Sequence, residues 1–419
     1  MPRAIRFAFA ASVLAGCGTT LDSLGYNDIR DGGLEVEADT GIVLHPLTGP
    51  SSYPNAFVTV LGKTDTDITN KIATTFASLF HGDPATQAIY FEVGNDQAYI
   101  RDTLHGDIRT EGMGYGMIIA VELNKRDEFD RIWRYAKNVA QYVSGSNAGY
   151  FRSDCDTVTG TTPCVDPFGL QQFTMALIFA HDRWGSTTTI DYASEAIALL
   201  EVMRNKEAQN GGVVDGVTNS FDATTQLVFD VPSTSAAGVS RPSIEMPAYY
   251  ELWAQATGDA FWKDAAAAGR AYWQKTANAT TGFMPTRATF DGTPVAGYDV
   301  FEPEGYRTQL NMVLDRIFGG SDTWAIDESN RLLTFFATQG IDQYGNVYSL
   351  DGLTEIGILH DDSLVAVNGA TALVATADTR FDFIDAAWNV SVPTMAPRYY
   401  SGLLDLLMLL ILSGQYRVY

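Results

Sequence analysis

Helical periodicity along almost the whole chain is the feature that most constrains its fold. In residues 67–80, for example, Ile68, Ile72 and Phe76 fall on one helix face. Alternation typical of strands is strong only in 211–231, which predicts a small β-hairpin insertion. About twelve helices are expected, over residues 67–80, 111–123, 127–142, 168–183, 190–205, 244–257, 260–275, 305–317, 322–339, 363–376, 380–388 and 399–413.

Short turns join many of the expected helices in pairs. The turns at 124–126, 258–259 and 319–321 are short, and short joints favour antiparallel neighbours. Helical hairpins can close into a toroid or stack as a solenoid, but a solenoid needs a fixed sequence period and none is visible. We therefore expect an all-α toroid of six helical hairpins. No linker interrupts residues 60–419, so one domain is expected over 51–419.

Residues 1–17 have the layout of an export signal. Arg3 and Arg6 precede an apolar run that ends in the tetrapeptide LAGC and is too short for a permanent membrane helix. LAGC resembles a bacterial lipobox, in which Cys17 becomes the lipidated first residue; a plain secretory signal is the alternative. We expect an exported protein, either lipid-anchored to the cell envelope at the outer membrane or secreted. Residues 18–50 lack helical periodicity and predict a flexible tether.

The composition excludes some partners and cofactors. The chain has 27 basic and 50 acidic residues, a net charge of −23, and would repel a polyanion such as nucleic acid. A neutral polymer would not be repelled, although solubility alone could account for the acidity. Cys155 and Cys164 could form a local disulfide in an exported protein, with two free thiols as the alternative. The histidines are scattered without metal-ligand spacing and no phosphate loop is present, so no metal or organic cofactor is expected.

One carboxylate, Glu111, stands at the head of an expected helix in the segment GDIRTEGMGYGM, residues 106–117. The longer stretch 106–136 resembles the signature region of glycoside hydrolase family 8. The resemblance continues in FTMALIFAHDRWG, MPAYYELWAQATGD, ATFDGTP, YRTQLNMVLD and PRYYSGLLDLLMLLILSGQYRVY, and so covers about residues 53–419. The family has an (α/α)6 barrel and includes xylanases, reducing-end xylose-releasing oligoxylanases, endoglucanases, lichenases and chitosanases. Its xylan-acting branch is the most similar.

The resemblance implies that Glu111 is the general acid of a glycosidase. Such an acid must stay protonated, and enclosure by apolar neighbours such as Met113 and Met117 would raise its pKa because burial disfavours the charged form. The alternative is a glutamate that merely starts a helix, where the helix dipole favours negative charge. Asp107 and Arg109 belong to the same motif, and we expect them to support the loop.

An inverting glycosidase also needs a second carboxylate, roughly 6.5–9.5 Å from the first, to activate water. In the family this base is an aspartate three residues before an arginine, which places it at Glu304 in register with Arg307. Arg307 would orient the base and lower its pKa. Glu302 is a second candidate for the base, and a solvated carboxylate at a helix start is the non-catalytic interpretation of Glu304.

The chain departs from the family pattern at several positions. A sugar-binding aspartate is replaced by Phe168, and Asp166, two positions away, is the expected substitute for substrate binding. Two tyrosines that help to hold the nucleophilic water are replaced by Ile244 and Pro303. A tryptophan that could stack on a sugar is replaced by Ser153.

The aromatic residues near the acid differ in expected role. Tyr115, which follows the acid closely, is the expected substrate contact. Trp133 and Tyr135 lie on a helical pattern, where aromatic side chains are more often core than sugar platforms.

The resemblance and these residues together imply an inverting glycoside hydrolase. The expected substrate is a β-1,4-linked polysaccharide or oligosaccharide, with xylan or xylo-oligosaccharides first. Chitosan comes second because the net charge would attract a cationic polymer, and a β-glucan is a further option. The alternative from another class is a surface lipoprotein that binds glycans without cleaving them. We expect a monomer.

Overall fold

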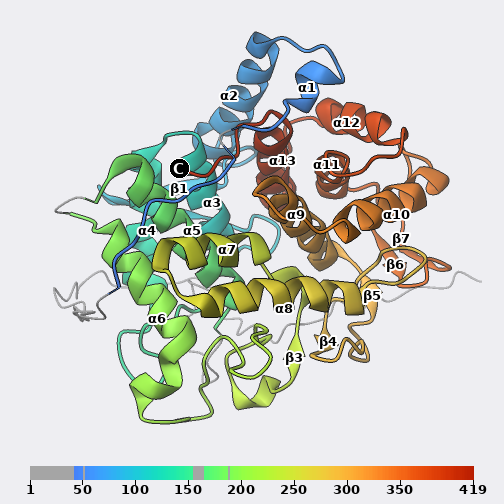
Figure 1. Ribbon diagram of the computed structural model, residues 1–419. Helices are drawn as coiled ribbons and strands as arrows, with labels where there is room; N and C mark the ends of the chain where they lie inside the picture. Colours follow the sequence, from blue (N-terminus) through green and yellow to red (C-terminus); the bar gives the residue numbers. More distant parts are fainter. Residues whose placement is uncertain (1–41, 51, 154–164, 187–188) are drawn as a thin grey trace, which may run out of the picture.

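The helices and strands of the protein are shown in Figure 1. The residues that this computed structural model describes are 42–50, 52–153, 165–186 and 189–419. Cys17, Cys155 and Cys164 lie outside these residues, so lipidation and the disulfide stay predictions. Among the described residues, no helix is both long and apolar enough to cross a bilayer.

All twelve helices expected from the sequence are present. A single turn, α1 (Ala56–Thr59), precedes them, and a π-helical turn (Ala136–Ala140) continues α4, so the expected helix at 127–142 is divided. The twelve are α2 (Asp65–His81), α3 (Thr110–Glu122), α4 (Arg126–Tyr135), α5 (Pro167–Trp184), α6 (Tyr192–Asn210), α7 (Pro247–Thr257), α8 (Ala260–Thr276), α9 (Pro303–Ile317), α10 (Trp324–Gln339), α11 (Asp362–Thr371), α12 (Arg380–Asn389) and α13 (Arg398–Leu412).

The helices form an inner and an outer ring. Helices α3, α5, α9, α11 and α13 are buried along most of their length. In the inner ring, α3 packs against α5 and α13, α11 against α9 and α13, and α7 against α9. Each odd-numbered helix from α3 to α11 also packs against the helix that follows it, and α13 packs against α2. Helices α3, α5, α9 and α13 begin at one end of the barrel, because residues near their starts contact one another directly or through Arg241 and Arg307. This is the expected (α/α)6 architecture.

The strands are short and form small, separate sheets. They are β1 (Tyr90–Val93), β2 (Gln97–Ile100), β3 (Val239–Ser240), β4 (Ala288–Thr289), β5 (Val300–Phe301), β6 (Val347–Ser349) and β7 (Glu355–Gly357). β1 and β2 form an antiparallel hairpin, β3 pairs with β4, and β5, β6 and β7 form a three-stranded sheet. The segment 211–231, where a hairpin was expected, forms only isolated bridges. Its Asp222 carboxylate accepts the N–H groups of Thr224 and Thr225, which makes a turn in place of a ladder.

Residues 42–50 lie against the barrel, which corrects the tether prediction at its C-terminal end. The N–H of His45 donates to the carbonyl of Ala256 at 2.7 Å. The N–H of Leu47 donates to the carboxylate of Asp182 at 3.1 Å. Since these acceptors lie near the C-terminal ends of α7 and α5, the segment crosses the end of the barrel opposite the helix starts. The lack of helical periodicity here reflects an extended segment, not a free one.

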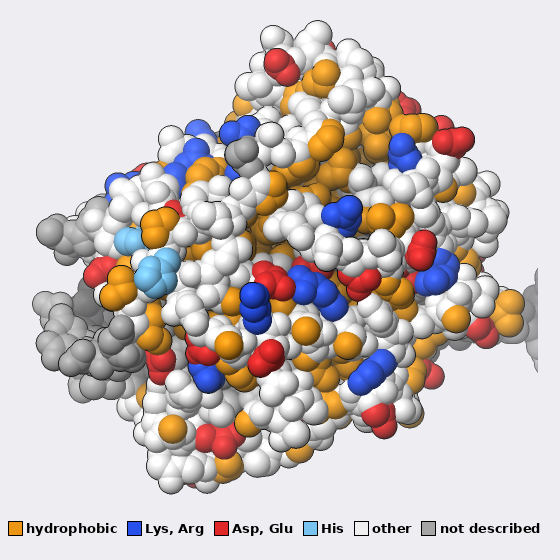
Figure 2. Space-filling model, in the orientation of Figure 1, with side chains coloured by type: hydrophobic (Ala, Val, Ile, Leu, Met, Phe, Trp, Pro, Cys, Tyr) orange, Lys and Arg blue, Asp and Glu red, His pale blue; other side chains and the backbone are white. Residues whose placement is uncertain are grey.

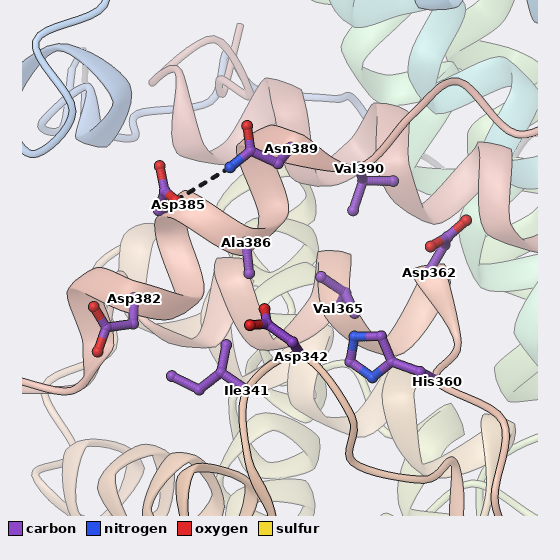
Figure 3. A pocket seen from close by; sticks show the side chains of 10 residues that line it. All are labelled: Ile341, Asp342, His360, Asp362, Val365, Asp382, Asp385, Ala386, Asn389 and Val390. Atoms are coloured by element: carbon purple, nitrogen blue, oxygen red, sulfur yellow. Dashed lines mark hydrogen bonds between the residues drawn. The ribbon is translucent and has the colours of Figure 1, made fainter.

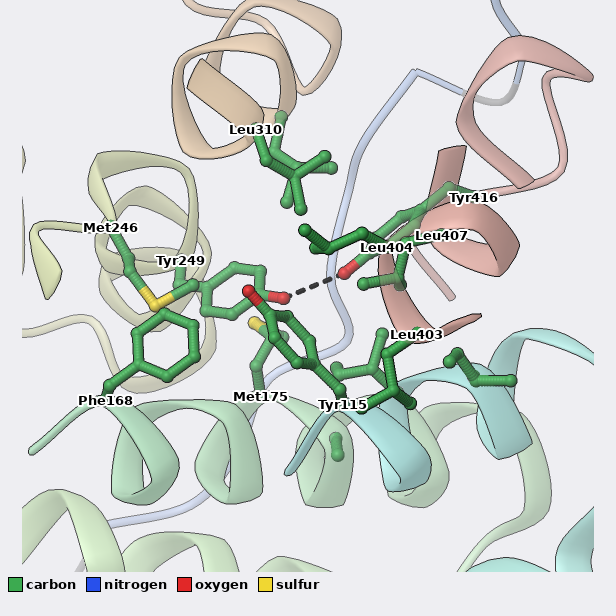
Figure 4. Close-up of a cluster of buried hydrophobic side chains, with 14 of the residues drawn as sticks. Tyr115, Phe168, Met175, Met246, Tyr249, Leu310, Leu403, Leu404, Leu407 and Tyr416 are labelled. Carbon is green, nitrogen blue, oxygen red and sulfur yellow. Dashed lines mark hydrogen bonds between the residues drawn. The ribbon is translucent and has the colours of Figure 1, made fainter. Parts of the chain in front are cut away.

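The barrel interior is filled by a continuous apolar core (Figure 4). Trp133 and Tyr135 are buried, as predicted, with exposed fractions of 1% and 8%. The core residues labelled in the close-up are Tyr115, Phe168, Met175, Met246, Tyr249, Leu310, Leu403, Leu404, Leu407 and Tyr416. The hydroxyls of Tyr249 and Tyr416 share a hydrogen bond of 2.8 Å, so these two core side chains also satisfy each other.

Candidate active site

Glu111 lies in the first turn of α3. The N–H of Thr110 donates to the carbonyl of Ser153 at 3.1 Å, which fixes the start of the helix. Gly112 lets an aromatic ring approach the acid, because a Cβ at this position would lie only 2.5 Å from the hydroxyl oxygen of Tyr399. The start of α3 therefore holds the carboxylate beside an aromatic wall.

The loop before α3 is held by an ion pair. Arg109 donates from Nε and from Nη2 to Asp107 at 3.0 Å each. Its guanidinium also lies 3.5 Å from the buried carboxylate of Asp102. These contacts agree with the expected role of Asp107 and Arg109 in supporting the loop.

Glu304 lies in the first turn of α9, directly after Pro303. One of its oxygens is 2.6 Å from Nη2 of Arg307 and accepts the hydroxyl of Ser243 at 3.0 Å. Glu302, the other candidate base, instead accepts the hydroxyl of Thr286 at 2.8 Å. The structure thus brings Glu304 to the charged centre of the site and gives Glu302 a different partner.

Arg307 joins the two carboxylates. Its Nη1 contacts Glu111 and its Nη2 contacts Glu304. The guanidinium is only 2% exposed and lies over the ring of Phe168, 4.6 Å from the ring centroid. One fixed cation therefore places the carboxylates of α3 and α9 on either side of itself.

The two carboxylates have opposite pKa shifts. Burial raises the pKa of Glu111, and the attraction of Arg307 offsets this only in part. Burial alone would also raise the pKa of Glu304, but Arg307 and Arg241 outweigh it and lower that pKa to about 2. One group is thus suited to hold a proton and the other to accept one.

Burial raises the pKa of Glu111 as expected, but Met113 is not a residue that encloses it. Met113 and Met117 are fully buried. However, the sulfur of Met113 accepts the N–H of Ile100 on β2 at 3.2 Å, so it faces the strand and not the acid. On a helix, a residue two positions after Glu111 points to a different face, which explains the error.

Tyrosines form the aromatic surroundings of the acid. Tyr115, Tyr399 and Tyr400 all interact electrostatically with its carboxylate. Tyr115 is only 3% exposed and packs edge-on against Phe168, so it lies beneath the carboxylates and not on an open surface, unlike the substrate contact that we expected. Sequence analysis missed Tyr399 and Tyr400, although both stand in the block PRYYSGLL that shares the family resemblance.

Asp166 has two structural roles at the start of α5. Its carboxylate caps the helix by accepting the N–H groups of Phe168 at 3.2 Å and Gly169 at 3.4 Å. Its Oδ1 also accepts Nη2 of Arg241 at 3.1 Å. Asp166 therefore shares Arg241 with Glu304, but its oxygens already have protein partners.

Arg241 was not expected from the sequence, because a single arginine in a loop carries no signal. Its Nε lies 2.8 Å from Asp230 and its Nη1 lies 3.5 Å from Glu304. Asp230 in turn lies 3.0 Å from Nε of Arg287. Figure 2 shows acidic and basic side chains gathered in the central hollow of one face.

Comparison with known proteins places the chain in a family. The sequence model described as Glycosyl hydrolases family 8 matches residues 95–414. The chain belongs to this family. A reducing-end xylose-releasing exo-oligoxylanase, Rex8A of Paenibacillus barcinonensis, is 33% identical over 89% of this chain and 100% of that protein. The reducing end xylose-releasing exo-oligoxylanase of Halalkalibacterium halodurans is 34% identical over 88% of this chain and 94% of that protein.

Solved structures agree with this assignment. The structure of Rex8A complexed with xylose has a TM-score of 0.82 and 33% identity, and covers 88% of this chain and 98% of that one. A crystal structure of a reducing end xylose-releasing exo-oligoxylanase has a TM-score of 0.81 and 34% identity, over 88% and 96%. As a member of family 8 the chain is a glycoside hydrolase with an (α/α)6 barrel, as expected from its sequence.

Two hydroxyl groups that the family resemblance implies are absent beside Glu304, the candidate base of this family 8 enzyme. Ile244 is fully buried. Pro303 offers only its carbonyl, which accepts the hydroxyl of Tyr400 at 2.7 Å. Tyr400 thus brings a phenol from α13 to the start of α9.

Two further features lie apart from the carboxylate pair. Among the described residues, no group of histidine, cysteine, aspartate and glutamate side chains could hold a metal ion. A separate cavity of about 430 Å³ lies between α11 and α12 and the loop before α11 (Figure 3), and its lining includes His360, Asp362 and Asp385 but neither Glu111 nor Glu304.

Proposed function

We propose that the protein hydrolyses xylo-oligosaccharides with inversion, with Glu111 as general acid and Glu304 as general base. The observation that carries the proposal is the pair of carboxylates at two helix starts, bridged by Arg307. The pKa of Glu111 is raised and that of Glu304 is lowered. The substrate class is supported by relatives that are named for releasing xylose from reducing ends.

The reaction follows from these protonation states. Ionised Glu304 takes a proton from water as the water oxygen bonds to the anomeric carbon. The bond from that carbon to the leaving oxygen breaks, and protonated Glu111 gives its proton to the departing sugar. A neutral Glu111 attracts Arg307 less than a carboxylate would, so Arg307 acts mainly on the base. Exchange of protons with solvent then restores both groups.

Other substrates have weaker support. Endoglucanase A of Acetivibrio thermocellus is 27% identical over 74% of this chain, which keeps a β-glucan as an alternative. Chitosan rests on the net charge of −23 alone. A binding protein without activity is less favoured, because the chain retains a carboxylate at both proposed positions and its relatives are enzymes.

The test uses protein that lacks residues 1–17, incubated with xylo-oligosaccharides, β-glucan and chitosan. New reducing ends are measured, and NMR identifies the anomer formed first. We expect cleavage of xylo-oligosaccharides with inversion, lost in E111Q and E304Q and kept in the matched control E302Q. Loss in E302Q with activity kept in E304Q would assign the base to Glu302 and contradict the proposal.

We also propose that the chain is exported and anchored by a lipid on Cys17, acts as a monomer, and contains a disulfide between Cys155 and Cys164. The LAGC tetrapeptide and the preceding basic and apolar residues support the anchor. Labelling of cells with a fatty acid should mark the full-length protein and not C17A. Size-exclusion chromatography of the protein without residues 1–17 tests the monomer, and thiol titration before and after reduction tests the disulfide.

A further inference from the structure

We infer that Arg241 is a positioning residue for the base Glu304, and that Asp166 and Asp230 serve this reaction by holding Arg241 and not by binding the sugar. The inference rests on the proposed function, because it assumes that Glu304 is the base. It concerns a residue for which neither the sequence pattern nor the family resemblance gave a role.

The guanidinium of Arg241 is fixed by a different carboxylate at each nitrogen. Nη2 contacts Asp166 at 3.1 Å, Nε contacts Asp230 at 2.8 Å, and Nη1 reaches Glu304 at 3.5 Å. The side chain is 14% exposed. Because Asp166 and Asp230 hold Nη2 and Nε, the planar guanidinium cannot rotate without losing contacts, so these two carboxylates set the direction in which Nη1 faces Glu304.

The backbone on both sides of Arg241 is fixed as well. Just before it, Ser240 pairs with Ala288 between β3 and β4. The carboxylate of Glu245, which is fully buried, accepts the hydroxyl of Ser240 at 3.1 Å and the N–H of Val228 at 3.0 Å. These bonds close the base of the loop that carries Asp230, so the arginine and its anchor are held by one rigid unit.

The geometry gives the base a cation of its own. Arg307 is shared between Glu111 and Glu304, whereas among its carboxylate partners Arg241 contacts only Glu304 of the catalytic pair. The other groups that face Glu304 are Ser243 from the segment before α7, Glu111 from α3 and Tyr400 from α13. Both Arg307 and Arg241 contact Glu304 directly, and this keeps Glu304 ionised although Asp166 and Asp230 also lie on Arg241.

The same contacts change the interpretation of Asp166. Its oxygens already accept two N–H groups of its own helix and the guanidinium of Arg241. A sugar hydroxyl would compete with charge-assisted and capping bonds at the same oxygens. Asp166 therefore acts on Glu304 through Arg241.

The test compares R241Q with the matched control R270Q. Arg270 is another partly buried arginine with two acidic partners, Asp315 at 2.7 Å and Glu251 at 2.8 Å, and it packs outside the site. Both variants should lose thermal stability. In R241Q alone the acidic limb of the profile of kcat/KM against pH should move upward by about one unit, because an opposite charge beside Glu304 is lost.

A milder variant, R241K, keeps the charge but cannot meet three carboxylates, and its limb should fall between those of R241Q and the wild type. An acidic limb in R241Q that coincides with the wild type, while E304Q is inactive, would overturn this inference and leave the proposed function intact. Activity retained in E304Q would instead overturn the proposed function. A limb that moves equally in R270Q would show a general effect of stability and also overturn the inference.

Discussion

The first turns of α3 and α9 look alike but carry opposite chemistry. Each turn begins an inner helix, each presents a glutamate, and each glutamate touches Arg307. Glu111 faces Tyr399, and Arg307, the cation that it contacts, is shared with Glu304, so burial dominates and the pKa of Glu111 is raised. Glu304 has a second cation, Arg241, and its pKa falls to about 2. Residue type and helix position therefore do not decide which carboxylate holds the proton; the neighbours do.

The largest effect is expected when either glutamate of the pair is replaced. E111Q and E304Q should each lower kcat on xylo-oligosaccharides by about 10²–10⁴-fold, the range for general acid–base groups. An aryl xyloside with an acidic phenol needs no proton on its leaving group, so it should restore much of the rate in E111Q and none in E304Q. The measurement is kcat on both substrates for both variants. Equal rescue of the two variants would contradict the assigned roles.

The next largest effect is expected when Arg307, the cation that both glutamates contact, is replaced. Arg307 lowers the pKa of both glutamates, so R307M should raise both. The base must be ionised, so activity appears as pH rises through the pKa of Glu304. The acid must be protonated, so activity is lost as pH rises through the pKa of Glu111. Both limbs of the kcat/KM profile should thus move upward, by about 1–3 units.

R307K tests whether one cation can serve both Glu111 and Glu304. A lysine ammonium keeps the charge but has no planar fork to contact two carboxylates at once. We expect one limb to stay near the wild-type position while the other moves. If neither limb moves, the bridging geometry of Arg307 does not control the protonation of the pair.

A smaller effect is expected from D166N, which should change the two limbs of the pH profile unequally. The charge of Asp166 contributes to the raised pKa of Glu111, so its removal should lower the alkaline limb by a fraction of a unit. Asparagine is as good a helix cap as aspartate, so α5 should keep its stability. The measurement is the pH profile together with the melting temperature, and D166A, which also loses the cap, is the control.

The sequence predicted the parts of this comparison that depend on local pattern. Periodicity located the helices, and the resemblance to family 8, which puts the expected base three residues before an arginine, placed Glu304 on the same helix as Arg307. Arg241 could not be found in this way, because its partners Asp166 and Glu304 lie far away in the sequence and meet only when α5 and α9 begin at the same end of the barrel. The burial of Tyr115 was missed for a similar reason, since Phe168, which covers it, comes from another helix.

The smallest expected effect compares two adjacent tyrosines of α13, one for each helix start. Tyr400 donates its hydroxyl to the carbonyl of Pro303 at the start of α9, at 2.7 Å. The hydroxyl of Tyr399, beside Gly112 at the start of α3, has no hydrogen-bond partner among the described residues. Y400F should therefore lower the free energy of unfolding by about 0.5–1.5 kcal/mol, the usual net value of one hydrogen bond, while Y399F should leave it nearly unchanged.

Denaturant unfolding of the two variants measures this difference in the free energy of unfolding. Measuring kcat tells whether the lost hydrogen bond also lowers the rate of the reaction. Because the bond from Tyr400 fixes the turn that carries Glu304, Y400F should also lower kcat on an aryl xyloside, which depends on the base alone. Y399F lies on the side of the acid, so its effect should be confined to substrates whose leaving group needs a proton. The reverse pattern would mean that Tyr400 does not act on Glu304, nor Tyr399 on Glu111, as the contacts indicate.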